Sequence, residues 1–275
     1  MNTPEEIKLV VKNKYAEIAK GSVSTCCTTD IKDYTVFKDD ASNLSGYVAD
    51  ADLGLGCGLP TEFAGIQQGD SVVDLGSGAG NDVFIARAIV GDKGIVTGID
   101  MTEEMIEKAN LNNNKLGYTN IEFRLGDIED IPLKNEYADV VVSNCVLNLV
   151  PDKRKAFSEI FRILKPGGHF CVSDVVLHGE MVDELKKSAE LYAGCVSGAL
   201  QQTEYLQIIG DAGFKGIEIK KTKKIELPDE LLTKYLSAQE MKEYKDMYSN
   251  NNSSRSSNGE SLKGIFSITV VAYKG

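Results

Sequence analysis

The sequence predicts an α/β fold built on a doubly wound, mostly parallel β-sheet. From about residue 70 onward, short apolar segments typical of strands alternate with segments whose apolar spacing is helical. In addition, the glycine-rich turn GSGAG joins the first of these strands to the helix after it. Because parallel strands need crossover connections, which are usually helical, this alternation indicates a parallel sheet with right-handed crossovers.

The central elements of this sheet are expected between residues 71 and 177. Strands are expected at 71–75, 94–100, 121–127, 138–146 and 169–177, with helices at 81–90, 102–117 and 152–168. The fourth of these strands contains an apolar run, which is typical of a strand buried on both faces. This apolar run therefore predicts a place inside the sheet.

Further elements are expected on both sides of this centre. A capping box of Thr3 and Glu6 predicts a helix from Pro4, and Gly21 is its expected end. The Ser-, Asp- and Gly-rich residues that follow are interpreted as a lid. Downstream we expect helices at 181–194, 203–213 and 227–247, strands at 216–221 and 264–275, and an Asn/Ser-rich loop at 249–261. The two late strands are expected to pair as an antiparallel edge.

Composition restricts the partners and the compartment. The chain of 275 residues carries a formal net charge of −11, without a basic cluster that outweighs it. This balance disfavours binding to nucleic acid or to an anionic membrane surface. No apolar run has the length of a membrane span, and the N-terminus lacks a signal-peptide pattern, so a cytoplasmic protein is expected. The six cysteines form no CxxC pair, which favours reduced thiols over a disulfide framework or a zinc site.

A ligand site is expected at the glycine-rich turn. Glycines let the backbone approach a ligand closely, and the following helix N-terminus favours an anionic group. The residues concerned are Asp74, Gly76, Ser77, Gly78 and Gly80. Their GxGxG spacing differs from the GxGxxG of dinucleotide-binding dehydrogenases, which makes a dehydrogenase a distant alternative.

Two further acids extend this site. Asp100 ends the second strand, where it can accept hydrogen bonds from two ribose hydroxyls. Asp127 follows the third strand, where it can read an adenine amino group with Ile128 against the ring. Each acid taken alone could be an ordinary helix cap or loop residue. Because three acids stand at the ends of consecutive strands around one glycine loop, a nucleoside site is the better interpretation.

Three cysteines stand where chemistry is expected. Cys145 follows Asn144 at the carboxyl end of the fourth strand, near the switch point of the sheet. Cys57 lies in GCG and Cys195 in GCVSG, and neighbouring glycines favour close backbone approach over core packing. A free cysteine is often only a buried apolar residue, and we interpret Cys171 in this way. Three converging thiolates would suit a thiophilic ion or metalloid.

The sequence resembles the class I S-adenosylmethionine methyltransferases, and within them the arsenite methyltransferases. DLGSGAG, the acid ending the second strand, the GDI turn and the paired terminal strands carry the first resemblance. The second rests on VKNKYAEIA with the CC pair, LGLGCGLP, VVDLGSGAGND, GIDMTEEM, IEFRLGDIEDIP, SNCVLNLVPDK, RILKPGG, AGCVSGAL and SITVVAYK. SNCVLNL and GCVSGAL are specific to the family. The lid before LGLGCG is short, and the Asn/Ser tract does not follow the family pattern.

The resemblance implies a seven-stranded class I methyltransferase sheet with an N-terminal helix and lid and a C-terminal extension. It divides the chain into an N-terminal helix and lid at 1–60, an S-adenosylmethionine-binding core at 61–180 and a C-terminal part at 181–275. The implied cofactor-binding residues are Asp74, Gly76, Ser77, Gly78, Gly80, Asp100, Met101, Asp127, Ile128 and Asn144. The implied arsenic-binding and catalytic residues are Cys57, Cys145 and Cys195.

The implied activity is methylation of trivalent arsenic for detoxification, with arsenite or its thiol complex as substrate. An external thiol reductant of the glutathione or thioredoxin type would complete the reaction. Two other functions remain open at this point. One is a small-molecule C- or O-methyltransferase, acting for example on a quinone or sterol, in which the cysteines are structural. The other is a metalloid-binding protein without turnover, although such a protein would need no nucleoside site.

The adjacent Cys26 and Cys27 are candidate redox residues. Neighbouring cysteines rarely bridge each other, because the Cα separation that a disulfide needs exceeds one peptide step. Methyl transfer formally oxidises trivalent arsenic, and two electrons return it to the trivalent state. A disulfide between one of these cysteines and a site cysteine would supply both electrons, and an external thiol would then reduce the disulfide. Otherwise the pair is part of an ordinary polar loop.

We predict that replacing both Cys26 and Cys27 by Ser slows multiple turnover on arsenite and spares arsenic binding. The reason is that the first methyl transfer needs no reduction, whereas each later cycle does. The measurement compares the single-turnover rate with the steady-state rate under limiting thiol. Equal loss in both rates would indicate a role in folding of the lid. No loss in either rate would indicate that the pair is part of an ordinary loop without a redox role.

Overall fold

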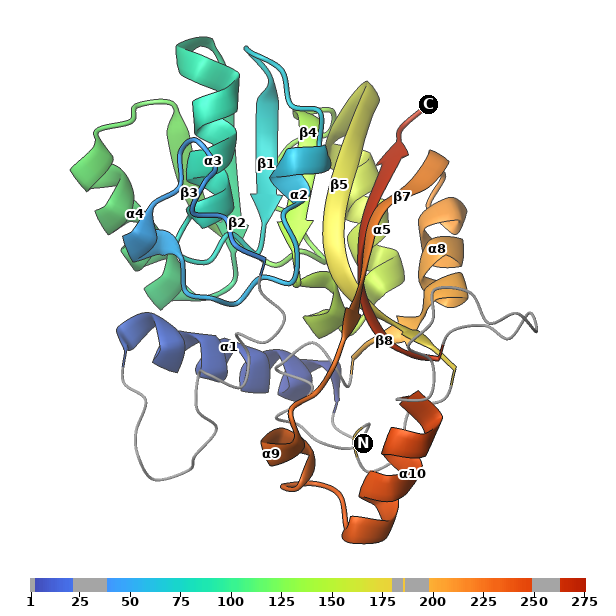
Figure 1. The fold of residues 1–275 in the computed structure, drawn as a ribbon. Helices are drawn as coiled ribbons and strands as arrows, with labels where there is room; N and C mark the ends of the chain where they lie inside the picture. The colour runs from blue at the N-terminus through green and yellow to red at the C-terminus, as the bar shows by residue number, and fades with distance from the viewer. Residues whose placement is uncertain (1–2, 22–38, 180–184, 186–197, 249–262) are drawn as a thin grey trace.

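The computed structural model describes residues 3–21, 39–179, 185, 198–248 and 263–275. Its central sheet has the strand order β3-β2-β1-β4-β5-β8-β7 (Figure 1), which confirms the predicted seven-stranded class I arrangement. The strands are β1 (Ser71–Leu75), β2 (Ile95–Asp100), β3 (Ile121–Leu125), β4 (Ala138–Asn144), β5 (Leu164–His178), β7 (Lys215–Ile225) and β8 (Gly264–Tyr273). A further strand of two residues, β6 (Leu200–Gln201), pairs with β5 off this path.

The register of the parallel strands aligns their carboxyl ends. Leu75 of β1 lies opposite Ile99 of β2 on one side and Ser143 of β4 on the other. β8 runs antiparallel to both β5 and β7, so the predicted antiparallel pairing of the two late strands is confirmed. The residues that follow β1, β2 and β4 therefore emerge side by side at one edge of the sheet.

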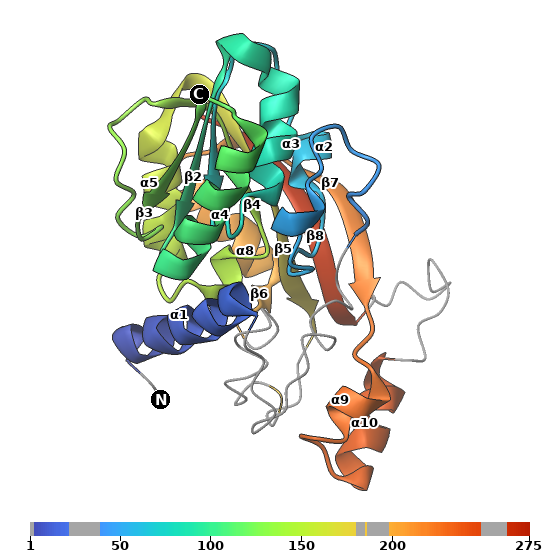
Figure 2. The same ribbon diagram turned by 90° about the vertical axis from the view of Figure 1, so that its left-hand side faces the viewer.

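Helices cover both faces of the sheet (Figures 1 and 2). They are α2 (Pro60–Phe63), α3 (Asn81–Val90) and α4 (Glu103–Leu116) on one face and α5 (Lys153–Ile163) and α8 (Gln202–Asp211) on the other. The first face buries Phe84 and Phe123 with the strand residue Cys171, which lies in the core as expected. The second face buries Phe157 and Tyr205, whose rings meet edge to face. Each sheet face thus has its own apolar core.

The N-terminal helix α1 (Pro4–Lys20) lies across the carboxyl ends of the strands (Figures 1 and 2). Its start is the predicted capping box, in which the Thr3 side chain and the Glu6 side chain each bond the other residue's backbone N–H. Gly21 ends it in the left-handed conformation, with φ at 64°. The helix packs beside α4 and buries Val11, so it forms a cover over the edge where the glycine loop emerges.

Two predicted helices are wrong in their extent. The helix expected at 152–168 ends at Ile163, and Leu164 already pairs with β4 as part of β5. Pro166 explains this, because the residue before a proline disfavours the helical conformation. The helical piece expected at 227–247 is two helices, α9 (Asp229–Leu232) and α10 (Ala238–Tyr248). Ser237 separates them, since its hydroxyl and the Glu240 carboxylate form a capping box.

Some strands end at other residues than predicted, and some predicted elements lie outside the described residues. The third strand ends at Leu125, two residues before Asp127, and the fourth ends at Asn144, before Cys145. β7 extends past its predicted end to Ile225, because β8 pairs with it along that length. The helix at 181–194, apart from Leu185, and the loop at 249–261 lie outside the described residues.

A third apolar cluster lies at the carboxyl edge of the sheet. It brings Val11 of α1 together with Cys57, Cys145, Leu232 of α9 and Tyr244 of α10. Segments from the start, middle and end of the chain thus contribute to one cluster that includes two cysteines. No helix in the described parts of the chain is long and apolar enough to cross a membrane.

Beneath this cluster, β5 buries an acid. The carboxylate of Asp174 accepts a hydrogen bond from the Tyr205 hydroxyl at 3.1 Å, and both side chains are fully buried. Burial raises the pKa of Asp174 from its ordinary value of 3.8 to about 7, although Lys153 and two backbone N–H groups act to lower it. Between these pH values the native protein keeps a proton that the unfolded chain has released.

We predict that the Asp174 carboxyl makes the native state less stable as the pH rises from about 4 to about 7. An acid with a raised native pKa contributes fully below its unfolded pKa and loses that contribution as the pH rises. Three pKa units correspond to about 4 kcal/mol. Urea unfolding of wild type and Asp174→Asn across this range measures it: the difference between the two curves should change with pH. Parallel curves would show that Asp174 does not titrate in this way.

Candidate functional site

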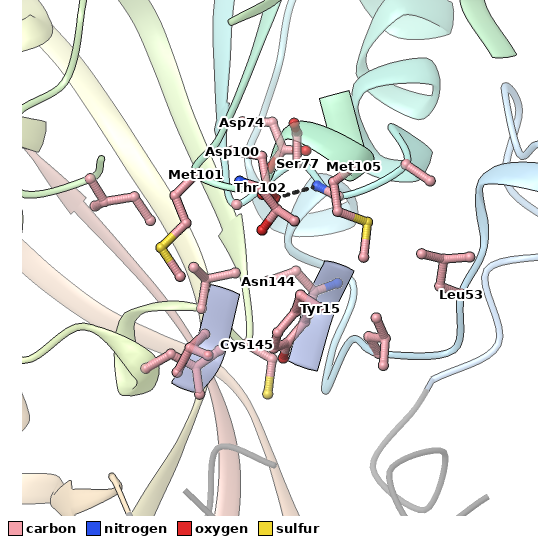
Figure 3. Close-up of a pocket in the computed structure, with 18 of the residues that line it drawn as sticks. Tyr15, Leu53, Asp74, Ser77, Asp100, Met101, Thr102, Met105, Asn144 and Cys145 are labelled. Atoms are coloured by element: carbon pink, nitrogen blue, oxygen red, sulfur yellow. Dashed lines mark hydrogen bonds between the residues drawn. The ribbon is translucent and has the colours of Figure 1, made fainter. Parts of the chain in front are cut away.

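A pocket lies between α1 and the carboxyl edge of the sheet (Figure 3). Its lining comes from α1, the loop before α2, and the segments after β1, β2, β3 and β4. The volume of the pocket, including open solvent at its mouth, is about 1060 Å³. The predicted site residues that line it are Asp74, Gly76, Ser77, Gly78, Asp100, Met101, Asp127, Ile128, Asn144 and Cys145. Gly80 instead lies at the start of α3.

The backbone conformation of the glycine loop requires glycine at several positions. Gly76, Gly78 and Gly80 have φ values of 74°, 51° and 99°. A Cβ at Gly76 would also lie 2.4 Å from a methyl carbon of Val146. The backbone N–H groups of Gly76 and Ser77 both donate to the carbonyl of Ile99 on β2. The loop is therefore held against the second strand, with its far side toward the pocket.

Asp100 holds the same loop from the end of β2. Its carboxylate accepts hydrogen bonds from the N–H of Gly78 at 3.0 Å and from the N–H of Thr102 at 2.8 Å. Burial raises the pKa of Asp100, although these bonds act to lower it. The acid thus has a structural role in shaping the loop and also lines the pocket. In Figure 3, Asp100 lies with Asp74 and Ser77 at one end of the pocket. Tyr15, Asn144 and Cys145 lie at the other end.

Asp127 is paired with a residue that sequence reasoning missed. The Lys8 ammonium of α1 lies 2.6 Å from the Asp127 carboxylate and 2.7 Å from that of Glu129. Burial acts to lower the pKa of Lys8, but its bonds to these two acids raise it. Ile128 between them is buried. No sequence signal indicates this contact, because it depends on how α1 crosses the sheet.

Three carboxylates cluster at the glycine-loop end. Asp74, Asp82 and Asp100 are all buried, and burial together with the nearby Asp82 and Asp100 raises the pKa of Asp74. Burial raises the pKa of Asp82 to about 6, although its bond from Asn144 acts to lower it. Sequence analysis missed Asp82, and its position in the first turn of the helix after the loop was the available signal.

Several buried polar atoms at this end have no protein partner. They are the hydroxyl of Ser77 and one side-chain oxygen each of Asn81 and Asp82. Unpaired buried polar atoms cost free energy, so such a group in a pocket indicates a place for a ligand atom. Acceptors beside buried acids suit a ligand with hydrogen-bond donors and positive charge. The amino group, ribose hydroxyls and sulfonium of S-adenosylmethionine fit this description.

Cys57 and Cys145 both belong to the apolar cluster beside this pocket. Cys145 follows β4 with φ at 61°, and its N–H donates to the carbonyl of Ser173 at 2.7 Å. Cys57 is fully buried, and its carbonyl accepts from the Ser267 hydroxyl at 2.6 Å. By contrast, burial in the other core raises the pKa of the Cys171 thiol to about 12. The structure brings together two of the three predicted arsenic ligands.

The remaining predicted cysteines are not described. Cys195, Cys26 and Cys27 lie outside the described residues. Among the residues the structure does describe, no three His, Cys, Asp or Glu side chains are grouped to hold a metal ion. A ligand set of three thiolates would therefore need Cys195, or another group from outside the described ranges.

With this geometry, the chain can be compared with known proteins. The methyltransferase-domain family matches residues 66–213, and the chain belongs to this family. Its strand order and glycine loop are those of the class I S-adenosylmethionine methyltransferase fold. Within that class, its similarity is to arsenite methyltransferases.

Two curated relatives and one solved structure carry this similarity. An arsenite methyltransferase from Halobacterium salinarum is 39% identical over 231 residues, covering 78% of this chain and 59% of the relative. The arsenite methyltransferase of Homo sapiens is 35% identical over 222 residues, covering 76% of this chain and 58% of the relative. An arsenic (III) S-adenosylmethionine methyltransferase from Chlamydomonas reinhardtii has a TM-score of 0.63 and 29% identity, covering 94% of this chain and 73% of that chain. The chain spans about three fifths of the length of these two curated relatives.

We predict that Asp100→Ala weakens binding of S-adenosylhomocysteine by about tenfold or more, since hydrogen bonds to a charged acceptor contribute about 1.5–3 kcal/mol. Calorimetric titration measures the affinity. Asp139→Ala is the matched control, because Asp139 pairs with Lys165 and the N–H of Ser71 at the amino end of the strands. Unchanged affinity in Asp100→Ala would contradict the assignment of Asp100 to the binding site.

Proposed function

We propose that this chain methylates trivalent arsenic, with S-adenosylmethionine as the methyl donor and cysteine thiolates as the arsenic ligands. The observation that carries the proposal is that Cys57 and Cys145 belong to one buried cluster and that Cys145 also lines the pocket. The arsenite methyltransferases to which the chain is similar support the same substrate. Detoxification of arsenic is the proposed role in the cell.

The pocket offers groups for each part of the donor. We assign Asp100 to the ribose hydroxyls, Asp127 to the adenine amino group, and Ile128 and Met101 to the apolar faces. The glycine loop suits the carboxylate of the methionine part, and the buried acids Asp74 and Asp82 suit its ammonium group. When bound, the donor supplies a methyl group on a positively charged sulfur.

The cysteines suit the proposed acceptor. Thiolates are soft ligands with affinity for thiophilic elements, and Cys195 is the proposed third ligand beside Cys57 and Cys145. Arsenic bound to three thiolates is pyramidal and keeps a lone pair, which attacks the methyl carbon as the carbon–sulfur bond breaks. This nucleophile has no proton to lose, so the protein does not need a general base. Holding two reactants in line can supply about 7–11 kcal/mol.

Reduction completes the proposed cycle. Methyl transfer leaves arsenic formally pentavalent, and two thiols that form a disulfide return two electrons to it. We propose that Cys26 or Cys27 forms this disulfide with a site cysteine. A thiol of the glutathione or thioredoxin type would then reduce it. The thiol reductant is thus a co-substrate of the proposed reaction.

We predict that Cys57→Ser and Cys145→Ser each abolish methylation of arsenite, because a hydroxyl is a poor ligand for a soft element. The measurement is incubation with arsenite, S-adenosylmethionine and glutathione, followed by speciation of the arsenic. Cys171→Ser is the matched control, since Cys171 lies in the other core, and it should keep the activity. Wild-type rates in Cys145→Ser would overturn the proposed site. Transfer only to organic acceptors by the wild type would indicate a C- or O-methyltransferase instead.

A further inference from the structure

The side-chain amide of Asn144 connects the lid to the pocket. Its oxygen accepts from the N–H of Cys57 at 3.1 Å and from the N–H of Gly58 at 3.3 Å. Its nitrogen donates to the carbonyl of Gly58 at 2.9 Å and to the Asp82 carboxylate at 3.0 Å. One amide therefore joins the backbone of a proposed arsenic ligand to an acid that lines the pocket. Asn144 also precedes Cys145, so both proposed arsenic ligands that the structure describes are connected to it.

The lid segment fits closely against this amide. A Cβ at Gly56 would lie 2.7 Å from the Asn144 side-chain nitrogen, and one at Gly58 would lie 2.5 Å from the Ser173 hydroxyl oxygen. The two glycines on either side of Cys57 therefore allow the close approach that the four hydrogen bonds need. Any displacement of the amide would move the Cys57 backbone with it.

At the Asp82 end of this connection, one carboxylate oxygen is available to a ligand. One oxygen of the Asp82 carboxylate accepts from Asn144, while its second oxygen is buried and has no protein partner. Asp82 lies in the first turn of α3, directly after the glycine loop, and lines the pocket. A cationic group that donates to the second oxygen would favour the charged form of Asp82 and hold its carboxylate in place as the acceptor for Asn144.

We propose that Asn144 is a positioning residue that couples occupancy of the amino-acid end of the cofactor pocket to the position of the Cys57 thiol. The sequence of contacts runs from the ligand ammonium group to Asp82, then to the Asn144 amide, then to the N–H of Cys57. An amide fixed by Asp82 keeps its oxygen toward Cys57, whereas the reversed amide would place its N–H groups against the N–H groups of the lid. Cofactor and arsenic therefore strengthen each other's binding, as reciprocal linkage requires. The inference rests on the proposed function.

The test compares two ligands that differ at the amino-acid end. S-adenosylhomocysteine carries the ammonium group, whereas adenosine fills the nucleoside part alone and does not reach Asp82. In wild type, we expect S-adenosylhomocysteine to tighten arsenite binding in glutathione buffer by about fivefold or more by calorimetry, and adenosine to change it by less than about twofold. Asn144→Ala should reduce the effect of S-adenosylhomocysteine to less than about twofold. An undiminished effect in Asn144→Ala would overturn the inference.

Two controls separate coupling from stability. Asn112→Ala removes another buried amide, which donates to the carbonyl of Ala79 on the glycine loop. It should keep the fivefold coupling even if both affinities fall. If Asn144→Ala does not fold, Asp82→Asn replaces it, because this variant keeps the shape and loses the charge that faces the ammonium. Coupling that persists in Asp82→Asn would equally overturn the inference.

A readout without arsenic distinguishes failure of the inference from failure of the proposed function. The rate of alkylation of Cys57 by iodoacetamide, followed by peptide mass spectrometry, should fall about fivefold with S-adenosylhomocysteine in wild type and stay unchanged in Asn144→Ala. A wild type that binds no arsenite yet shows this protection would reject the proposed substrate and keep the coupling. Protection that is equal in both proteins would reject the coupling and leave the substrate open to its own test.

Discussion

The parallel pairing of β1 with β2 on one side and β4 on the other is the constraint on which the site depends. It sets Leu75, Ile99 and Ser143 in one row, so the chain leaves all three strands at the same level. Two contacts secure this row. The glycine loop donates to the carbonyl of Ile99, and the Ser143 hydroxyl donates to the carbonyl of Leu75 at 2.8 Å. The glycine loop, the acid of β2 and the Asn144–Cys145 pair therefore meet because of the register of the backbone.

Charge distribution then limits what this edge can bind. Asp74, Asp82 and Asp100 lie buried at the glycine-loop end of the pocket, and among the described residues that line it Lys8 is the one Lys or Arg. Lys8 is engaged by Asp127 and Glu129. Buried acids without a nearby cationic side chain favour a cationic ligand and repel phosphates. This field suits S-adenosylmethionine and argues against the pyrophosphate of a dinucleotide, which agrees with the GxGxG spacing.

The sequence was sufficient to predict those features that follow from local pattern. The strands, the glycine loop and the acid at the end of β2 obey rules of periodicity, turn chemistry and parallel topology. Contacts between distant segments obey no such rule. Asn144 bonds Cys57, 87 residues earlier in the chain, and Lys8 bonds Asp127, 119 residues later. Both depend on how a loop and a helix pack across the finished sheet.

Other errors came from competition between local signals. The apolar spacing of 227–247 predicts one helix, but the capping box at Ser237 starts a second one within it. Likewise, the pattern up to Gly168 is helical, whereas Pro166 and the pairing of Leu164 with Ala138 favour a strand. Asp82 was missed for a different reason. An acid in the first turn of a helix is common, and only its burial and unpaired oxygen distinguish it.

Cys145 and Cys171 show how the backbone conformation gives two cysteines different surroundings. Cys171 continues β5 in regular pairing, fully buried in the core, and burial raises its pKa to about 12, so it remains a thiol. Cys145 stands one residue beyond β4 with φ at 61°, a conformation that costs a non-glycine residue about 1–3 kcal/mol. Asn144 and the N–H bond to Ser173 hold this turn in place. The strained turn directs the chain out of the sheet at the point where the pocket and the apolar cluster adjoin. In the proposed reaction, a thiolate at this position would hold a soft, electron-rich atom against the donor, while its apolar neighbours exclude water.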